Sequence, residues 1–513
     1  MGTSLSKTTT FKKILIANRG EIALRIVRAC KEMGIKTVVP FSDVDRFSLA
    51  VTCAEESYPL NGNDAKDTYL NIEKLIQIAK DSGAEAVHPG YGFLSENYLF
   101  AKACQDNGVV FIGPTPDVIK SMGDKISAKM TVKKARIPVV RGINRAIHSL
   151  DRAKRLAKII GYPVIIKAVN GGGGKGMRAV TDERLLSRAL QSASREANSS
   201  FNSDQVYIEK FIDNPRHIEV QILADNYGNM IHLYERDCTI QRRHQKLLEE
   251  APCPVLRPKQ REHLGQLAIK ACKAMNYKNA GTVEFLMDSQ GQFYFMEINA
   301  RIQVEHTVTE MITGVDLIKE QIKIAAGEKL RYRQSDITIS GHAIECRINA
   351  EDTEADFLPS TGVIDDIILP GGNGVRVDTA LKNNYEVNTY YDSMLAKIIV
   401  HAKDRPGAIN KMSSALGEMK ISGVKTTISF FRKILMDPLF LASRYTTKFL
   451  ETFRIDDTKD GVHFDAAAIL AALYYKRSKS AKGYSASLNA ANKKDNKWAQ
   501  AGRSDSIRIS RGW

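Results

Sequence analysis

The stretch Lys13-Ile-Leu-Ile-Ala-Asn-Arg-Gly-Glu-Ile-Ala-Leu-Arg-Ile-Val-Arg-Ala-Cys30 predicts the first unit of an α/β fold. Its opening run, Lys13 to Ala17, is short and continuously apolar, which is typical of a buried parallel strand. After a turn at residues 18–20, apolar residues recur at helical spacing. Lys36 to Val39 reads as a second strand, so about 30 residues give a βαβ unit.

The same pattern continues along the chain, with further strands predicted at Ala86–Pro89 and Val109–Ile112. We therefore interpret residues 10–122 as one α/β domain. The loop after its first strand lacks the GxGxxG pattern, which argues against a dinucleotide site. Pro40 cannot donate to a sheet, so we expect the second strand to end there at an edge or a bend.

Three further segments follow. Residues 123–335 hold the densest chemistry. Residues 340–453 mix short strands with a helix around Pro406–Lys420, which indicates an α+β C-terminal domain. In residues 454–513, Phe464–Arg477 is a strong helix former with Asp465 placed to cap it, and the basic end is expected to be disordered.

Composition narrows the class of protein. The formal charge of +16 is diffuse, apart from ten Lys or Arg residues against three Asp after residue 463. A diffuse excess suits an enzyme with anionic substrates at least as well as a nucleic-acid binder, which we do not expect. No stretch approaches the roughly 20 apolar residues of a membrane span. The seven cysteines contain no CxxC pair, so we expect buried thiols in a cytoplasmic protein.

A glycine run, Gly171-Gly-Gly-Gly-Lys-Gly176, follows the apolar strand Tyr162–Lys167. Consecutive glycines let backbone N–H groups approach phosphate oxygens closely. Lys175 and Lys167 could add positive charge there. Taken alone, the run could equally be a flexible linker.

A carboxylate hairpin supports the phosphate interpretation. Thr282–Met287 and Gln292–Asn299 read as two antiparallel strands joined by a turn at Asp288–Gly291. Glu297 and Asn299 would share one strand face, and Glu284 would face them. Three hard oxygen ligands suit Mg²⁺, although charged residues on a strand face are often only solvated.

Arg301, Gln303 and Glu305 alternate directly after this hairpin and would continue the same face. A guanidinium can hold a small planar oxyanion, and a nearby carboxylate can act as a general base. This combination predicts a bicarbonate site, with a simple Arg–Glu ion pair as the alternative. Cations also cluster at residues 214–219 and 235–246. Such clusters indicate that anions bind there, and a solvated face is the alternative for each of them. We expect His88 to be a structural turn residue.

In their order along the chain and in their residues, these segments resemble the biotin carboxylase family of the ATP-grasp superfamily over roughly residues 11–450. The matching motifs include ILIANRGEIALRIVRAC, AVHPGYGFLSEN, MGDK, NPRHIEVQ, ERDCTIQRRHQK, FYFMEINARIQVEH and ECRINAED. Thr307 departs from the pattern, because the family commonly has proline there. Residues 454–513 lie outside the resemblance. It implies that residues 10–122 form a Rossmann-like N-terminal domain and that residues 123–335 form an ATP-grasp domain whose lid covers about residues 140–210.

The resemblance implies a role for each matching residue. ATP would be bound by Lys125, Lys167, Gly172, Gly173, Gly174, Glu209, Lys210, Ile212, His217 and Gln241. Magnesium, or manganese in its place, would be held by Glu284, Glu297 and Asn299. Bicarbonate would be bound by Lys246, Arg301 and Gln303 with the Val304 backbone. Glu305 would be the general base, and Arg347 would stabilise the enolate of biotin.

The resemblance also implies the reaction. Glu305 would deprotonate bicarbonate, which attacks the γ-phosphoryl group of ATP. The carboxyphosphate breaks down to CO₂ and phosphate, the phosphate takes the N1 proton of biotin, and the enolate attacks CO₂. The chain has no Met-Lys-Met biotinylation motif, so the biotin carboxyl carrier protein and the carboxyltransferase would be separate chains. We expect a homodimer and hypothesise that Phe464–Trp513 docks onto one of those partners. Two alternatives stay open: another ATP-grasp ligase, and a non-catalytic binding subunit.

Overall fold

The structure is a computed structural model that describes residues 10–142, 146–147, 149–169, 176–201, 203–453, 470 and 473. The chain divides into two units, Met1–Arg454 and Ile455–Trp513. Three predictions fall outside the described residues. They are the glycines 171–174 of the glycine run, the Phe464–Arg477 helix apart from Leu470 and Leu473, and the basic end of the chain.

The N-terminal part of the first unit is a five-stranded parallel sheet in the order β3-β2-β1-β4-β5. Its elements are β1 (Lys13–Ile16), α1 (Gly20–Glu32), β2 (Lys36–Phe41), η1 (Asp43–Asp45), α2 (Leu49–Cys53), β3 (Glu56–Pro59), α3 (Ile72–Ser82), β4 (Ala86–His88), α4 (Tyr98–Asp106), β5 (Val110–Phe111) and α5 (Pro116–Gly123). The predicted βαβ unit is confirmed. His88 is buried, and its Nδ1 accepts a hydrogen bond from the N–H of Gly90 (3.1 Å), as expected of a turn residue.

Pro40 does not end the second strand, and this part of the prediction is wrong. β2 continues to Phe41 and lies between β1 and β3. Its register with β1 stops at Val38, whereas its register with β3 runs from Val38 to Phe41. Pro40 therefore lies where only one side of the strand is paired, so its missing N–H breaks no hydrogen bond to β1.

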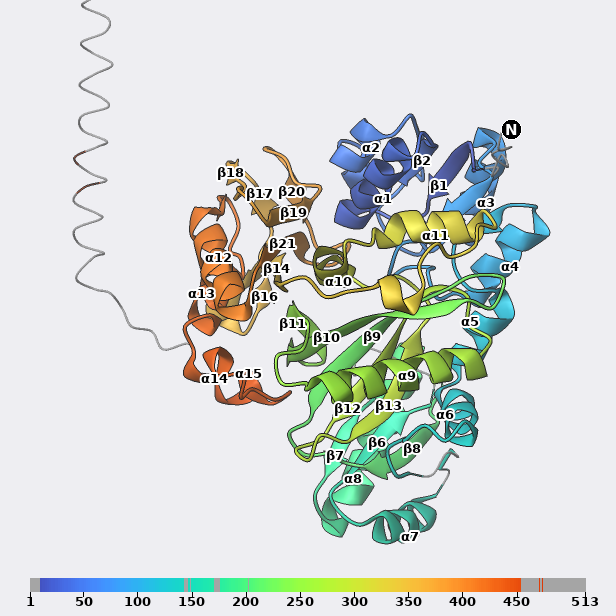
Figure 1. Ribbon diagram of the computed structural model, residues 1–513, viewed down its shortest axis with the longest axis vertical. Coiled ribbons are helices and arrows are strands. Elements are labelled where there is room, and N and C mark those ends of the chain that lie inside the picture. Colours follow the sequence, from blue (N-terminus) through green and yellow to red (C-terminus); the bar gives the residue numbers. More distant parts are fainter. Residues whose placement is uncertain are drawn as a thin grey trace, which may run out of the picture. The chain divides into compact units, whose positions relative to one another are not determined.

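The middle part contains a three-stranded sheet, β7-β6-β8, and most of an eight-stranded sheet in the order β13-β12-β9-β10-β11-β14-β21-β19. Its elements are α6 (Lys125–Lys134), α7 (Leu150–Ile160), β6 (Val164–Ala168), β7 (Arg178–Val180), α8 (Glu183–Phe201), β8 (Val206–Lys210), β9 (Arg216–Ala224), β10 (Met230–Arg242), β11 (Gln245–Ala251), α9 (Pro258–Ala274), β12 (Asn279–Met287), β13 (Phe293–Asn299), α10 (His306–Thr313) and α11 (Leu317–Ala325). α9 packs across β9, β10 and β12 (Figure 1).

The C-terminal part completes the large sheet. Its elements are η2 (Gln334–Asp336), β14 (His342–Asn349), β15 (Glu351–Asp352), η3 (Thr353–Ala355), β16 (Leu358–Pro359), β17 (Gly362–Val363), β18 (Ile367–Ile368), β19 (Val375–Thr379), β20 (Glu386–Val387), β21 (Met394–Ala402), α12 (Arg405–Glu418), β22 (Lys420–Ile421), α13 (Ile428–Ile434), α14 (Pro438–Leu441) and α15 (Phe449–Thr452). The helix predicted around Pro406–Lys420 is confirmed as α12. Because β14 pairs with β11, the sheet crosses the predicted domain boundary near residue 340.

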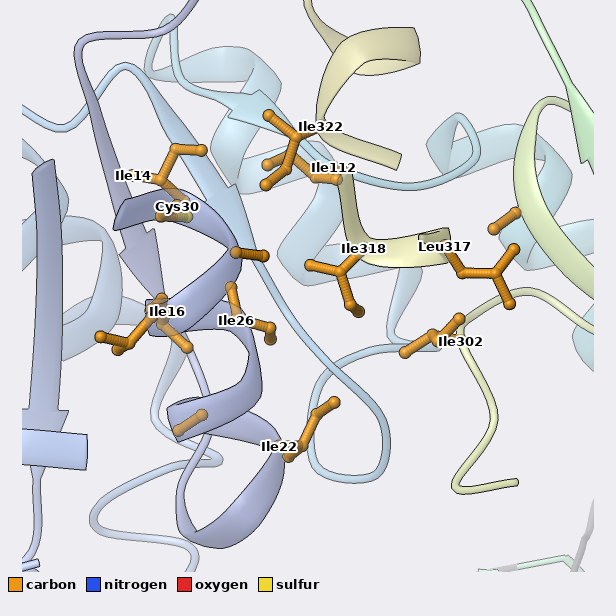
Figure 2. Packing of buried hydrophobic residues seen from close by; sticks show 14 of the residues in the cluster. Ile14, Ile16, Ile22, Ile26, Cys30, Ile112, Ile302, Leu317, Ile318 and Ile322 are labelled. Carbon is orange, nitrogen blue, oxygen red and sulfur yellow. The ribbon is translucent and has the colours of Figure 1, made fainter. Parts of the chain in front are cut away.

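A continuous apolar core joins the first sheet to the middle part. Ile22 and Ile26 of α1 are buried in the same cluster as Ile302, Leu317 and Ile318, and Figure 2 shows α1 facing this second group. Burying each of these side chains stabilises the fold by about 1.5–3 kcal/mol. The N-terminal part is therefore packed against the segment that leads from β13 through α10 to α11.

All seven cysteines are free thiols, and six of them, including Cys30, Cys104 and Cys272, are buried. This agrees with the prediction of buried thiols. Within the described part of the chain, no helix combines the length and apolar character needed to cross a lipid bilayer.

Candidate active site

The predicted carboxylate hairpin is present as β12 and β13. Glu284 and Glu297 are direct cross-strand partners, and a bulge follows between Glu284 and Phe285. Asn299 Nδ2 donates to Glu284 Oε1 (2.9 Å). His217, from the neighbouring strand β9, places Nε2 2.9 Å from Glu284 Oε2. The hairpin register therefore brings all three predicted oxygen ligands together on one face of the sheet.

Lys246 on β11 is the centre of this face. Its ammonium group contacts three carboxylates: Glu219 at 2.5 Å, Glu284 at 2.9 Å and Glu305 at 2.7 Å. The three N–H donors of a lysine match these three acceptors. Burial opposes the charge of Lys246, but the surrounding carboxylates outweigh it and raise its pKa well above the usual value.

Glu305 lies between cations that come from three strands. Besides Lys246, its Oε2 accepts from Arg347 Nη2 on β14 (2.9 Å), and Arg236 on β10 adds charge. Burial alone would raise the pKa of Glu305, but Lys246, Arg347 and Arg236 hold it well below the usual range. The fully buried carboxylate is therefore kept ionised.

Glu305 reaches this place by a route that the sequence did not predict. Arg301, Gln303 and Glu305 were expected to alternate on an extended strand, but β13 ends at Asn299, and residues 300–305 are irregular up to the start of α10. Glu305 is the N-cap residue of α10. The side chains nevertheless converge, because this segment is anchored in the apolar core through Ile302.

Arg301 and Gln303 lie beside the carboxylate hairpin. Arg301 Nη1 donates to Gln303 Oε1 (2.8 Å), and Gln303 Nε2 donates to Glu284 Oε1 (3.2 Å). Arg301 Nε donates to Glu96 Oε2 (3.0 Å), a residue that follows β4 in the N-terminal part. The predicted anion-binding residues are therefore together, and one end of the guanidinium is fixed by Glu96.

A second charged cluster lies on β6, β8 and α6. Glu209 on β8 is fully buried and contacts Lys167 of β6 (3.1 Å) and Lys129 of α6. Burial opposes the ionisation of Glu209, but these two lysines outweigh it and lower its pKa. Lys125 at the start of α6 contacts Glu297 Oε2 (2.8 Å), so α6 supplies a cation to each cluster.

The remaining predicted ligands of ATP are placed as follows. Lys210 Nζ donates to the carbonyls of Gly161 (3.1 Å) and Tyr162 (3.0 Å). Ile212 is half-buried just after β8, and Gln241 is half-buried opposite Lys246 in the β10–β11 register. Gly172, Gly173 and Gly174 lie outside the described residues.

Several charged residues of this region were given no individual role by sequence reasoning. They are Glu96, Lys129, Glu219, Arg236, Glu249, Glu345 and Lys397. Arg236 is 0% exposed and donates to Glu219 (2.5 Å), Gln221 (2.8 Å) and Thr309 (2.9 Å). A hint was available for some of them, since Glu219 and Arg236 stand in apolar strands where an unpaired charge would be costly.

The donor set fits a hard divalent cation. Glu284 and Glu297 offer carboxylate oxygens from paired strands, with the amide oxygen of Asn299 close by. In the structure, Lys125, Lys246 and His217 compensate the charge of these two carboxylates. His217, Glu219 and Glu284 also bring one possible ligand atom each within 4.8 Å of one another. Oxygen ligands of this kind are those that Mg²⁺ prefers.

Three family models match consecutive parts of the chain. They are the biotin carboxylase N-terminal domain over residues 10–119, the carbamoyl-phosphate synthase L chain ATP-binding domain over 124–333, and the biotin carboxylase C-terminal domain over 345–452. The biotin carboxylase of Nostoc sp. is 54% identical over 441 residues, which are 86% of this chain and 99% of that protein. The chain belongs to the biotin carboxylase family.

Other relatives of this biotin carboxylase are parts of larger enzymes. One of the pyruvate carboxylase subunits of Methanothermobacter thermautotrophicus is 52% identical over 444 residues, which are 86% of this chain and 90% of that protein. The biotin carboxylase domain dimer of Hydrogenobacter thermophilus 2-oxoglutarate carboxylase was solved with MgADP, ADP and bicarbonate. It is 51% identical, has a TM-score of 0.85 and matches 86% of this chain and 98% of that one. The predicted three-domain ATP-grasp fold is therefore confirmed.

Proposed function

We propose that this biotin carboxylase uses ATP and bicarbonate to carboxylate biotin held on a separate biotin carboxyl carrier protein. One observation carries the proposal: Glu305 is kept ionised between Lys246 and Arg347, and Lys246 also contacts Glu284, the cross-strand partner of Glu297. A base, an anion site and a metal-ligand pair on one sheet face match the needs of bicarbonate activation. The biotin carboxylase relatives and the structure with MgADP and bicarbonate support it.

In the proposed first step, Glu305 takes the proton of bicarbonate while a bicarbonate oxygen attacks the γ-phosphorus of ATP and ADP leaves. A carboxylate with so low a pKa is a weak base. Bicarbonate bound by Arg301 and Lys246 would compete for the cations that lower the pKa of Glu305, and the base would strengthen as its substrate binds. Magnesium held by Glu284, Glu297 and Asn299 supplies positive charge toward the phosphate oxygens.

In the proposed second step, carboxyphosphate breaks down to CO₂ and phosphate, and the phosphate accepts the N1 proton of biotin. Arg347 then stabilises the oxygen of the biotin enolate as its nitrogen attacks CO₂. Water must be kept away from these intermediates. Gly172, Gly173 and Gly174 are proposed as part of the lid that closes over them.

For the nucleotide, we propose that Lys125 and Lys167 bind the phosphates. Glu209, Lys210 and Ile212 are proposed to contact the adenine, and His217 and Gln241 the ribose and phosphates. Lys167 and Lys125 are suitable because each is held by a carboxylate, Glu209 and Glu297 respectively. A strongly hydrated ammonium in such a place is a good point charge for phosphate.

For partners, we propose a homodimer that works with a separate carrier protein and a separate carboxyltransferase. The dimer of the 2-oxoglutarate carboxylase domain and the division of pyruvate carboxylase into subunits in a relative support this arrangement. We also propose a cytoplasmic location, which the seven free cysteines support because thiols persist in reducing compartments.

The proposed function is tested by ATP hydrolysis of the purified full-length chain with magnesium. We expect turnover that requires bicarbonate and rises when free biotin is added. Hydrolysis that is indifferent to bicarbonate would contradict the proposal and favour another ATP-grasp ligase.

We predict that Glu297→Gln raises the magnesium concentration needed for half-maximal activity and lowers kcat by about 10²-fold. The reason is that one of two carboxylates that balance the metal charge is lost, and several kcal/mol of charge stabilisation depend on that metal. Activity would be titrated with magnesium at saturating ATP. The exposed Glu262→Gln on α9 is the control, and an equal magnesium requirement in both variants would refute metal binding by Glu297.

A further inference from the structure

A pair of glutamates lies behind the arginine of the site and has no part in the mechanism above. Glu249 on β11 and Glu345 on β14 are direct antiparallel partners, and both are 0% exposed. Partners of this kind have side chains on the same face, about 4.5–5.5 Å apart at Cβ. Two like charges at that separation in a buried place repel each other strongly, so the two carboxylates, hereafter the glutamate pair, need compensation.

The nearby cations do not fully compensate the negative charge of the glutamate pair. Arg347 contacts Glu249, but the same Nη2 also serves Glu305. The three N–H donors of Lys246 are used by Glu219, Glu284 and Glu305. Lys397 on β21 donates to the carbonyl of Val304 (2.8 Å) and contacts Glu21 (3.1 Å).

The carboxylate oxygens of the glutamate pair also lack hydrogen-bond donors. Thr307, in the first turn of α10, donates its hydroxyl to Glu345 Oε2. From the described residues, Glu345 Oε1 and Glu249 Oε2 accept no hydrogen bond, and Glu249 Oε1 has only its ion pair with Arg347. Buried carboxylate oxygens are rarely left in this state. One proton on the pair would turn one acceptor into a donor and remove one of the two charges.

We propose that Glu249 and Glu345 share one proton and position Arg347 with the single negative charge that remains. The inference rests on the proposed function, in which Arg347 faces the biotin enolate. With one charge, the pair holds the guanidinium of Arg347 in place, and the guanidinium can still interact with Glu305 and the substrate. With two charges, the pair would draw Arg347 away and place negative potential beside the developing enolate oxygen.

The electrostatics of the pair agree with this geometry. Burial, with the charges of the neighbouring carboxylates, raises the pKa of Glu249 to about 7 and that of Glu345 to about 8, against the effects of Arg347, Lys246 and Lys397. The hydrogen bond from Thr307 lowers the pKa of Glu345. The pair titrates as a unit, and these ionisable groups face it: Lys246, Arg347, Lys397, Glu305, Cys238 and Cys346.

The first test is infrared spectroscopy of the full-length protein across pH 6 to 10. We expect a carboxylic acid signal at pH 7 that disappears at alkaline pH and is missing in Glu345→Gln. A wild-type protein without such a signal would overturn the shared proton. This measurement requires no turnover, so it decides the state of the pair even if the proposed function fails.

The second test is the pH profile of biotin carboxylation. Wild type should lose rate as the pair ionises with rising pH. Glu345→Gln should keep about the wild-type rate at pH 7 and lose this alkaline decline. Thr307→Val should move the decline to higher pH, because it removes the bond that favours the ionised form of Glu345. A decline unchanged in both variants would overturn the proposal.

The variant Glu249→Gln distinguishes a role of the glutamate pair in positioning Arg347 from a purely structural role. We expect it to lower biotin carboxylation by about 10²-fold, the usual effect of a displaced catalytic group. Bicarbonate-dependent ATP hydrolysis without biotin should fall much less, because Lys246 still contacts Glu305 (2.7 Å), and equal loss of both activities would overturn the positioning role. Glu250→Gln is the matched control, since Glu250 is also buried but bonds to His342 and Arg405. It should lower the unfolding temperature without moving the alkaline decline.

Discussion

Glu305→Gln is expected to lower bicarbonate-dependent ATP hydrolysis by about 10³-fold, within the range attributed to a general base. The amide keeps the size of the side chain but cannot accept a proton. It also cannot balance Lys246 and Arg347, which contact the carboxylate at 2.7 Å and 2.9 Å. The measurement is the steady-state release of ADP with saturating ATP and magnesium, with and without bicarbonate.

A measurement of nucleotide binding distinguishes loss of the chemical step in Glu305→Gln from damage to its fold. The predicted ATP ligands Lys167 and Glu209 lie in the second cluster, so Glu305→Gln should bind ADP about as well as the wild type. The control is Glu320→Gln on α11, a buried carboxylate that contacts Lys323 (2.6 Å) away from the site. If Glu305→Gln kept its bicarbonate-dependent rate, Glu305 would not be the base.

The sequence predicted the local parts of this molecule well. The βαβ unit of β1, α1 and β2 and the hairpin of β12 and β13 depend on periodicity and turn residues within a few positions. The hairpin register then follows from its turn, which is why Glu284 was correctly placed opposite Glu297. A resemblance in ordered motifs supplied the residues from distant segments that join them.

What the sequence could not show is how distant charges compensate one another. Lys246 meets Glu219, Glu284 and Glu305 because β11, β9, β12 and the start of α10 converge in space. Alternating charge on these strands left solvated faces open as an alternative to an anion site, and only burial distinguishes the two. Glu305 illustrates the same limit, since it reaches the site from a helix N-terminus and not from the strand that its spacing suggested.

Lys246→Met is expected to destabilise the protein and to abolish bicarbonate-dependent activity. Removing one partner of a buried ion pair costs about 3–5 kcal/mol, because the remaining charges stay buried without compensation. Here three carboxylates lose their common cation. The thermal unfolding midpoint should therefore fall at pH 8, and the loss should exceed that of Lys425→Met, an exposed lysine with one ion pair to Asp352.

The pH dependence of that loss identifies its cause. In the wild type, the pKa of Glu284 and of Glu305 is held well below the usual value, so their stabilisation is present above the unfolded pKa and is lost as pH falls through the folded pKa. In Lys246→Met, burial and mutual repulsion would raise both pKa values, because only Arg347, Arg236 and His217 still oppose them. The variant should then lose less stability than the wild type as pH falls. We therefore expect the two midpoints to approach each other from pH 8 toward pH 5. A constant difference would show that Lys246 acts through packing of its side chain, because only its charge responds to protonation of Glu284 and Glu305.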